Sequence, residues 1–154
     1  MKVLDTYQAP FGKIPELRLS NVPRWGIVKM SKKQSVAEHS FNVAAITSYL
    51  CNALGMDDEA EKAEICDALW HDYDEIFTGD IPTTAKVKQD SHPTIVKLAD
   101  LLESYAFCDN HCTDTKEIKN WVLKPMYNKI IAVSDYLEIP YEVYSEFMEG
   151  GSHV

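Results

Sequence analysis

This sequence has no long apolar run and comparatively few positively charged residues. Its longest purely apolar stretches, such as residues 130–133, fall far below the roughly 20 residues that a membrane-spanning helix needs. Lysine and arginine number 15 against 24 aspartates and glutamates, so the formal net charge is −9. Binding to a nucleic-acid polymer or an anionic membrane requires a basic surface. We therefore expect neither partner.

Cysteine is also scarce, and its spacing does not indicate a disulfide framework. The four cysteines lie in or near helical patterns, at Cys51, Cys66, Cys108 and Cys112. Reduced thiols in a cytosolic protein are the simpler interpretation. The first 13 residues contain Asp5 and no continuous apolar core, which is not typical of a signal peptide. We expect a cytoplasmic location.

What is present is an ordinary globular composition with helical patterning. With 154 residues, 45% of them hydrophobic, and no repeat or long linker, we expect a single domain over residues 1–154. Apolar residues recur at helical spacing between Ser35, which predicts an N-cap, and Gly55, which predicts a stop. A second helix is expected to begin at Asp57 or Asp58 and to continue past His71 until residues 77–82 break it.

Three more helices are expected in the second half of the chain. One runs from after Pro93 to about Cys108, one covers about 114–137, and a short one follows Pro140. Pro125 should kink or divide the long helix, because proline removes an i→i−4 hydrogen bond. A short helix is also expected near residues 16–20. No period-2 alternation persists, so the predicted fold class is all-α, a bundle of about five to seven helices.

Three polar elements lie on stripes that are expected to face the core: His39, the pair His71-Asp72, and Asp100. Buried ionisable groups are costly unless they are paired, hydrogen-bonded or bound to metal. Imidazole nitrogens with carboxylate oxygens suit a divalent ion such as zinc, manganese or cobalt. Because neighbouring residues on a helix point about 100° apart, His71 and Asp72 can bind one ion only from a groove between helices. A hydrogen-bonded core histidine is the alternative interpretation of His39.

The same residues resemble a known family. Their order is similar to the H…HD…D signature of HD-domain metal-dependent phosphohydrolases. Arg24-Trp25, residues 38–40 (EHS) and residues 71–83 (HDYDEIFTGDIPT) resemble the RW, EHS and HD-x-x-E-x-x-TGD-[LI]-PT blocks of bacterial 5′-deoxynucleotidases. Residues 96–100 (VKLAD) resemble the K-x-A-D element of that family. The resemblance covers about residues 20–107 and implies a compact HD-domain helical bundle, with C-terminal helices over about 114–149.

Within this group, the short length of the chain and Trp25-Gly26-Ile27 most resemble the compact phage dATP triphosphohydrolases. This resemblance implies hydrolysis of dATP to deoxyadenosine plus triphosphate, by attack of a metal-activated water on the α-phosphorus. Two alternatives stay open. One is a 5′-deoxynucleotidase that converts a dNMP to deoxynucleoside plus phosphate, and the other is a degenerate module that senses a nucleotide without cleaving it. If the chain is phage-encoded, its location would be the host cytoplasm.

The resemblance also implies a role for each motif residue. The expected ligands of a divalent ion (zinc, cobalt, manganese or magnesium, with zinc or cobalt favoured) are His39, His71, Asp72 and Asp100. Glu75 would orient or deprotonate the attacking water, or protonate the leaving 5′-oxygen, and a surface glutamate is its alternative interpretation. Asp80 would assist as a second carboxylate, or else cap the following segment.

The substrate-binding residues that the resemblance implies are Arg24, Trp25, Ile27, Lys86 and Lys88. The arginine and one or both lysines would hold phosphate, and either lysine is equally explained as a solvated loop charge. Trp25 would stack on the base or exclude a ribose 2′-hydroxyl, with a core anchor as the alternative. Ile27 would fill the space that a purine 2-amino group needs, which gives incomplete discrimination on its own.

Relatives in this family form dimers and larger rings, so a homo-oligomer, from dimer to hexamer, is expected. Trp121, Tyr127 and Tyr141 are candidate interface residues, and core packing explains them as well.

Overall fold

The computed structural model describes residues 14–80 and 92–150. The elements, in chain order, are the 3₁₀ helix η1 (Pro15–Asn21) and the helices α2 (Val36–Ala53), α3 (Asp58–Trp70), α4 (Glu75–Thr78), α5 (Ile95–His111), α6 (Lys116–Tyr136) and α7 (Tyr141–Met148). The described residues contain no strand, only two isolated bridges that pair Pro23 with Ser35 and Met30 with Cys112. The predicted all-α fold is confirmed.

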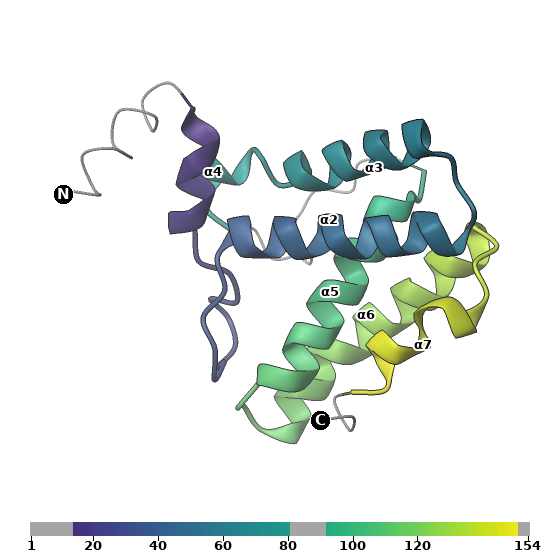
Figure 1. Ribbon diagram of the computed structural model, residues 1–154. Coiled ribbons are helices and arrows are strands. Elements are labelled where there is room, and N and C mark those ends of the chain that lie inside the picture. The colour runs from purple at the N-terminus through teal and green to yellow at the C-terminus, as the bar shows by residue number, and fades with distance from the viewer. Residues whose placement is uncertain (1–13, 81–91, 151–154) are drawn as a thin grey trace.

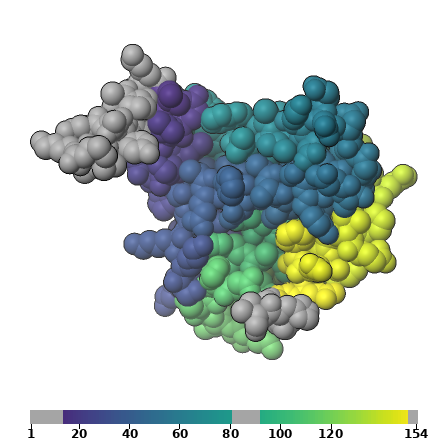
Figure 2. Space-filling view, viewed as in Figure 1, coloured from purple at the N-terminus to yellow at the C-terminus, as the bar shows by residue number. Residues whose placement is uncertain are grey.

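The helices form two layers that meet at α5. Helices α2 and α3 lie side by side in one layer, and α5 crosses beneath them and packs against α6 and α7, of which α7 also contacts α2 (Figure 1). Figure 2 shows the same division at the surface, with the α2 and α3 residues above those of α5 and α7. The core between the layers is apolar, and its fully buried members include Leu50, Leu98, Leu102 and Ile130. The central position of α5 is what allows one of its polar residues to meet side chains from the upper layer.

The helix starts and stops follow the local capping chemistry. The Ser35 hydroxyl accepts the Glu38 N–H at 3.1 Å, and the Asp57 carboxylate accepts the Ala60 N–H at 2.9 Å, so each satisfies a donor that the helix leaves free. After α2 the chain turns at Gly55, whose φ of +68° is a left-handed conformation that glycine adopts without strain. These boundaries agree with the predicted ones.

The predicted extent of the second helix is wrong. Helix α3 ends at Trp70, so His71 and Asp72 lie in the turn between α3 and α4 instead of on a helix face. If the helix continued, Asp67 and Trp70 would share the face of His71 that is expected to point inward, but Asp67 is exposed and Trp70 is 52% exposed. The His71 imidazole bonds to the Ala68 carbonyl through Nδ1 at 2.6 Å, and thus satisfies an acceptor at the helix end. The turn directs these two adjacent side chains at one centre, which neighbouring residues on a regular helix, about 100° apart, reach less easily.

A kink or a division of the long helix is expected at Pro125, and the division is wrong, because α6 is continuous from Lys116 to Tyr136. The proline removes one hydrogen bond to the carbonyl four residues earlier, that of Trp121. Both residues are exposed, so water can take the place of the missing donor.

Three aromatic side chains, for which the sequence allowed either core packing or an interface, lie on the surface. Trp121 is 66% exposed, and Tyr127 and Tyr141 are each 42% exposed. Core packing therefore does not explain them. In the described part of the chain, no helix combines the length and the apolar character that crossing a membrane requires.

Candidate metal centre

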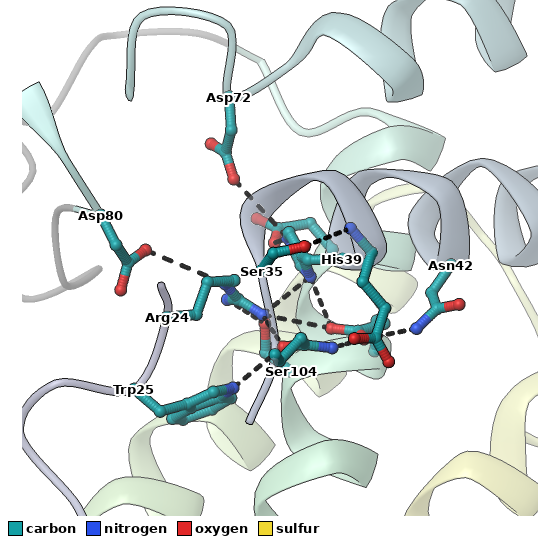
Figure 3. Close-up of polar contacts among 12 residues, drawn as sticks. Arg24, Trp25, Ser35, His39, Asn42, Asp72, Asp80 and Ser104 are labelled. Atoms are coloured by element: carbon teal, nitrogen blue, oxygen red, sulfur yellow. Dashed lines mark hydrogen bonds and ion pairs between the residues drawn. The ribbon is translucent and has the colours of Figure 1, made fainter. Parts of the chain in front are cut away.

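Three parts of the fold bring the four predicted ligands together. His39 is buried on α2, Asp100 is on α5, and His71 and Asp72 come from the turn after α3. Nε2 of His39 lies 3.6 Å from Asp72 Oδ2 and 3.1 Å from Asp100 Oδ1. Nε2 of His71 lies 3.2 Å and 3.8 Å from the same two oxygens. Figure 3 shows Asp72 pointing from its turn toward His39.

This spacing fits one divalent ion. Ligand atoms about 2.0–2.1 Å from a tetrahedral zinc ion lie roughly 3.3–3.4 Å from one another, and the four distances here are 3.1–3.8 Å. Ligand atoms of His39, His71 and Asp72 all lie within 4.8 Å of one another. Nε2 of His71 is buried and makes no hydrogen bond within the described residues, as expected of an atom whose partner is a metal ion. Two imidazoles and two carboxylates also form a donor set that zinc and cobalt accept.

The outer nitrogen of each histidine is held by the protein. His71 Nδ1 donates to the Ala68 carbonyl at 2.6 Å, and His39 Nδ1 donates to Glu103 Oε2 at 2.5 Å. A proton on Nδ1 leaves the lone pair of Nε2 directed at the centre, which is how metal-binding histidines are commonly oriented.

The charges of the centre shift the pKa values of its members. Burial lowers the pKa of His71, but the carboxylates of Asp100 and Asp72 outweigh it and raise that pKa to about 10. Burial also opposes a charged His39, yet Asp100 and Glu103 leave its pKa raised. Although burial favours a protonated Asp100, contacts with His39 and His71 hold its pKa well below the usual range. The anionic carboxylates are thus poised to bind a cation, which would compete with the histidine protons.

Glu75 and Asp80 lie on the segment that continues from the ligand turn. Glu75 begins α4 and is only 3% exposed, so the surface-glutamate interpretation is wrong. Its backbone N–H donates to the Asp72 carbonyl at 3.1 Å, which ties it to the ligand turn. Asp80 Oδ1 lies 3.8 Å from Arg24 Nε, and Figure 3 shows its carboxylate facing that guanidinium.

Of the predicted substrate residues, Arg24 and Trp25 lie beside the centre. Arg24 donates to the side chains of Gln34 at 2.7 Å, Ser104 at 3.1 Å and Glu103 at 3.3 Å. The Trp25 ring stacks on Phe107 with centroids 5.9 Å apart, and the Arg24 guanidinium lies 5.1 Å from the indole centroid.

The other three predicted substrate residues are placed differently. Ile27 is 59% exposed on the loop that follows Trp25. Lys86 and Lys88 lie outside the described residues.

Sequence reasoning missed Gln34 and Glu103, which are 3% and 5% exposed. Glu103 follows Asp100 by three residues and therefore shares its stripe, so a carboxylate beside a predicted ligand was an available signal. Gln34 precedes the cap of α2 and gives no comparable signal.

An all-helical fold that gathers a histidine, a His-Asp pair and a distant aspartate at one centre, in this chain order, defines the class of HD-domain proteins. Comparison with known proteins gives the family. Residues 16–153 match the family described as 5′-deoxynucleotidase YfbR-like, and the chain belongs to that family.

Two phage proteins and one bacterial protein are among its relatives. The dATP triphosphohydrolase of Acinetobacter phage SH-Ab 15497 is 33% identical over 138 residues, which cover 82% of this chain and 64% of that protein. The dATP triphosphohydrolase of Salmonella phage PMBT28 is 34% identical over 126 residues, 62% of this chain and 64% of that protein. The 5′-deoxynucleotidase YfbR of Escherichia coli is 32% identical over 80 residues, 49% of this chain and 39% of that protein. The chain thus spans less than two thirds of the length of these curated relatives.

A solved structure shares the fold. The HD phosphohydrolase of cyanophage S-2L, described as bound to dA and one catalytic Zn²⁺ ion, superposes with a TM-score of 0.68 at 22% sequence identity. The superposition covers 87% of this chain and 95% of that chain.

Proposed function

We propose that the chain hydrolyses dATP to deoxyadenosine and triphosphate, with water attacking the α-phosphorus and the nucleoside 5′-oxygen leaving. The observation that carries this proposal is that the Nε2 atoms of His39 and His71 lie 3.1–3.8 Å from carboxylate oxygens of Asp72 and Asp100, across three parts of the fold. Two phage relatives named dATP triphosphohydrolases support the substrate. The dA and Zn²⁺ of the cyanophage protein support a deoxyadenosine pocket beside a zinc site.

A divalent ion held by these four residues, with zinc or cobalt favoured, would lower the pKa of a coordinated water and polarise the phosphorus centre. The buried carboxylate of Glu75 would orient the attacking water and accept its proton. Asp80 would act as the second carboxylate, and its 3.8 Å contact with Arg24 would hold it in place.

The nucleoside would bind beside Trp25. Because Phe107 stacks on the indole and the Arg24 guanidinium lies 5.1 Å from its centroid, the ring serves as a fixed wall that excludes a ribose 2′-hydroxyl, in preference to stacking on the base. Ile27 is exposed and would contact the purine 2-position only when a nucleotide is present. Arg24 would add positive potential near the phosphates, and Lys86 and Lys88 would contact them.

The family description favours a second function, a 5′-deoxynucleotidase that releases inorganic phosphate from dNMPs. The same metal ligands and Glu75 would serve it, so geometry does not separate the two substrates. The two activities are distinguished by the products that they release.

The test is to incubate the purified zinc-loaded or cobalt-loaded chain with dATP and with dAMP and to resolve the products. Deoxyadenosine plus intact triphosphate from dATP, in equal amounts, is the expected result. Phosphate from dAMP with dATP untouched would move the assignment to the 5′-deoxynucleotidase. Nucleotide binding without any product would indicate a sensing module.

We also propose that the chain acts as a homo-oligomer and in the cytoplasm, that of the host if it is phage-encoded. The exposed indole of Trp121 supports an interface on α6. Light scattering on the wild type and on Trp121→Ser tests this, and a monomeric wild type would contradict it.

A further inference from the structure

We propose that Gln34 and Glu103 form a positioning pair that connects the metal centre to the substrate wall made by Arg24 and Trp25. The proposal deepens the proposed function and rests on it. Both side chains are buried, and Gln34 Nε2 donates to Glu103 Oε1 at 2.5 Å. They come from different parts of the chain, Gln34 from the loop before α2 and Glu103 from α5.

On the metal side, Glu103 determines which nitrogen of His39 carries the proton. Its Oε2 accepts from His39 Nδ1 at 2.5 Å, so Nε2 is left to face Asp72 and Asp100. Arg24 Nη1 also lies 2.8 Å from His39 Nδ1. With the Nδ1 proton directed at Glu103, this contact is not a hydrogen bond. The two Nη1 hydrogens instead serve Gln34 and Glu103.

On the substrate side, the Gln34 carbonyl oxygen accepts two hydrogen bonds. Trp25 Nε1 donates to Oε1 at 3.0 Å and Arg24 Nη1 donates to it at 2.7 Å. Trp25 has a φ of +66°, a left-handed conformation that is uncommon for a bulky residue and persists only where surrounding contacts fix it. The Gln34 bond and the Phe107 stack are such contacts. Figure 3 shows the Trp25 nitrogen and the Arg24 guanidinium converging below His39.

The chemistry of the pair explains why residue 34 is a glutamine. The side chain must donate to the Glu103 carboxylate and also accept from an indole and a guanidinium. A carboxamide does both, whereas a glutamate would place two carboxylates against each other without a donor between them. A leucine would fill the space and leave two partly buried donors, on Trp25 and Arg24, without this acceptor.

The test compares two binding equilibria that do not depend on turnover. Co²⁺ affinity is measured by competition with a chromophoric chelator, and deoxyadenosine affinity is measured by calorimetry on the cobalt-loaded protein. Glu103→Gln should weaken Co²⁺ binding about 10-fold to 100-fold, as outer-shell substitutions at metal sites commonly do. Gln34→Leu should weaken deoxyadenosine binding about tenfold or more and leave Co²⁺ affinity within about threefold.

Exchanging the two residues by combining Gln34→Glu with Glu103→Gln (the reversed pair) distinguishes a positioning role from a nonspecific loss of structure. Gln34→Glu alone should weaken both affinities, because its carboxylate faces that of Glu103. Adding Glu103→Gln to it restores a donor and an acceptor between the two positions, and deoxyadenosine binding should recover to within about threefold of the wild type. This pair of variants also serves if Gln34→Leu does not fold.

Ser134→Ala is the matched control, since it removes a buried hydrogen bond of 2.7 Å to Tyr144 at a distance from the site. It should lower thermal stability and move neither affinity. The proposal is overturned if Glu103→Gln keeps Co²⁺ affinity within threefold, if Gln34→Leu keeps deoxyadenosine affinity, or if the reversed pair gives no recovery. A wild type that binds Co²⁺ and deoxyadenosine without hydrolysing dATP would overturn the proposed function and leave the pair in place.

Discussion

Metal binding should stabilise the folded chain, and removing one ligand should abolish most of that effect. The four ligand atoms come from α2, from the turn after α3 and from α5, so they are assembled only in the folded state. An ion that binds the folded chain alone adds RT ln(1 + [L]/Kd) to the free energy of unfolding. At a free zinc concentration of 100 times Kd, this is about 2.7 kcal/mol. For a domain of this size, each kcal/mol raises Tm by about 2–4 °C, so the expected shift is roughly 5–11 °C.

The perturbation is Asp100→Asn, which removes a carboxylate that Lys97 orients through a 2.9 Å bond. If the substitution weakens zinc binding about 100-fold, the same zinc concentration equals the new Kd. The stabilisation then falls to about 0.4 kcal/mol, a Tm shift of about 1 °C.

Differential scanning fluorimetry of chelator-treated protein, with and without zinc, measures both shifts. Asp109→Asn is the control, because Asp109 is also on α5 but pairs with Lys119 at 3.0 Å, away from the centre. Asp109→Asn should keep the full zinc shift. A wild type that zinc does not stabilise, or an Asp100→Asn variant with an undiminished shift, would refute the assignment of the metal ligands.

Three further predictions concern the catalytic carboxylate, the base pocket and the thiols. Glu75→Gln should lower kcat by about 10²–10⁴-fold while keeping the zinc-induced Tm shift, and kinetics with an unchanged kcat would remove it from the reaction. Ile27→Ala should increase hydrolysis of dGTP relative to dATP by up to about tenfold, and should change the free energy of unfolding by less than about 0.5 kcal/mol because the side chain is 59% exposed. An unchanged substrate ratio would place Ile27 outside the pocket. Ellman's reagent should label the exposed Cys66 quickly, and Cys108 only on unfolding, since burial raises its pKa to about 12. Rapid labelling of Cys108 in the native protein would contradict its burial.

The parts of the fold that could be predicted from the sequence are those set by local signals. Ser35, Asp57 and Gly55 define helix ends through their own side chains or backbone freedom, and the structure places the ends where they indicate. The end of α3 has no such signal. There His71 satisfies the Ala68 carbonyl, and helical periodicity alone does not reveal that bond.

Some residues of the site could likewise be predicted from the sequence, and others could not. His39 and Asp100 stand out because ionisable residues on inward-facing helix stripes need a partner, whereas His71 and Asp72 lie in a turn and are recognisable through the family motif. Gln34 does not stand out, since its partner Glu103 is 69 positions away and only the packing of the loop before α2 against α5 brings them together. The role of a polar residue that positions another polar residue can be recognised only from the three-dimensional structure.

The distribution of charge at the centre bears on how a triphosphate is held in a chain of net charge −9. Among the described residues, the cations in contact with the centre are Arg24 and Lys97, and both are engaged with carboxylates, Arg24 with Glu103 and Lys97 with Asp100. Asp72 adds a further negative charge, so these groups together do not offset the triphosphate. A bound divalent ion would neutralise the carboxylates without leaving much surplus. The phosphate tail therefore needs positive charge from elsewhere, which keeps Lys86 and Lys88 as its predicted partners and makes dATP binding more salt-sensitive than deoxyadenosine binding.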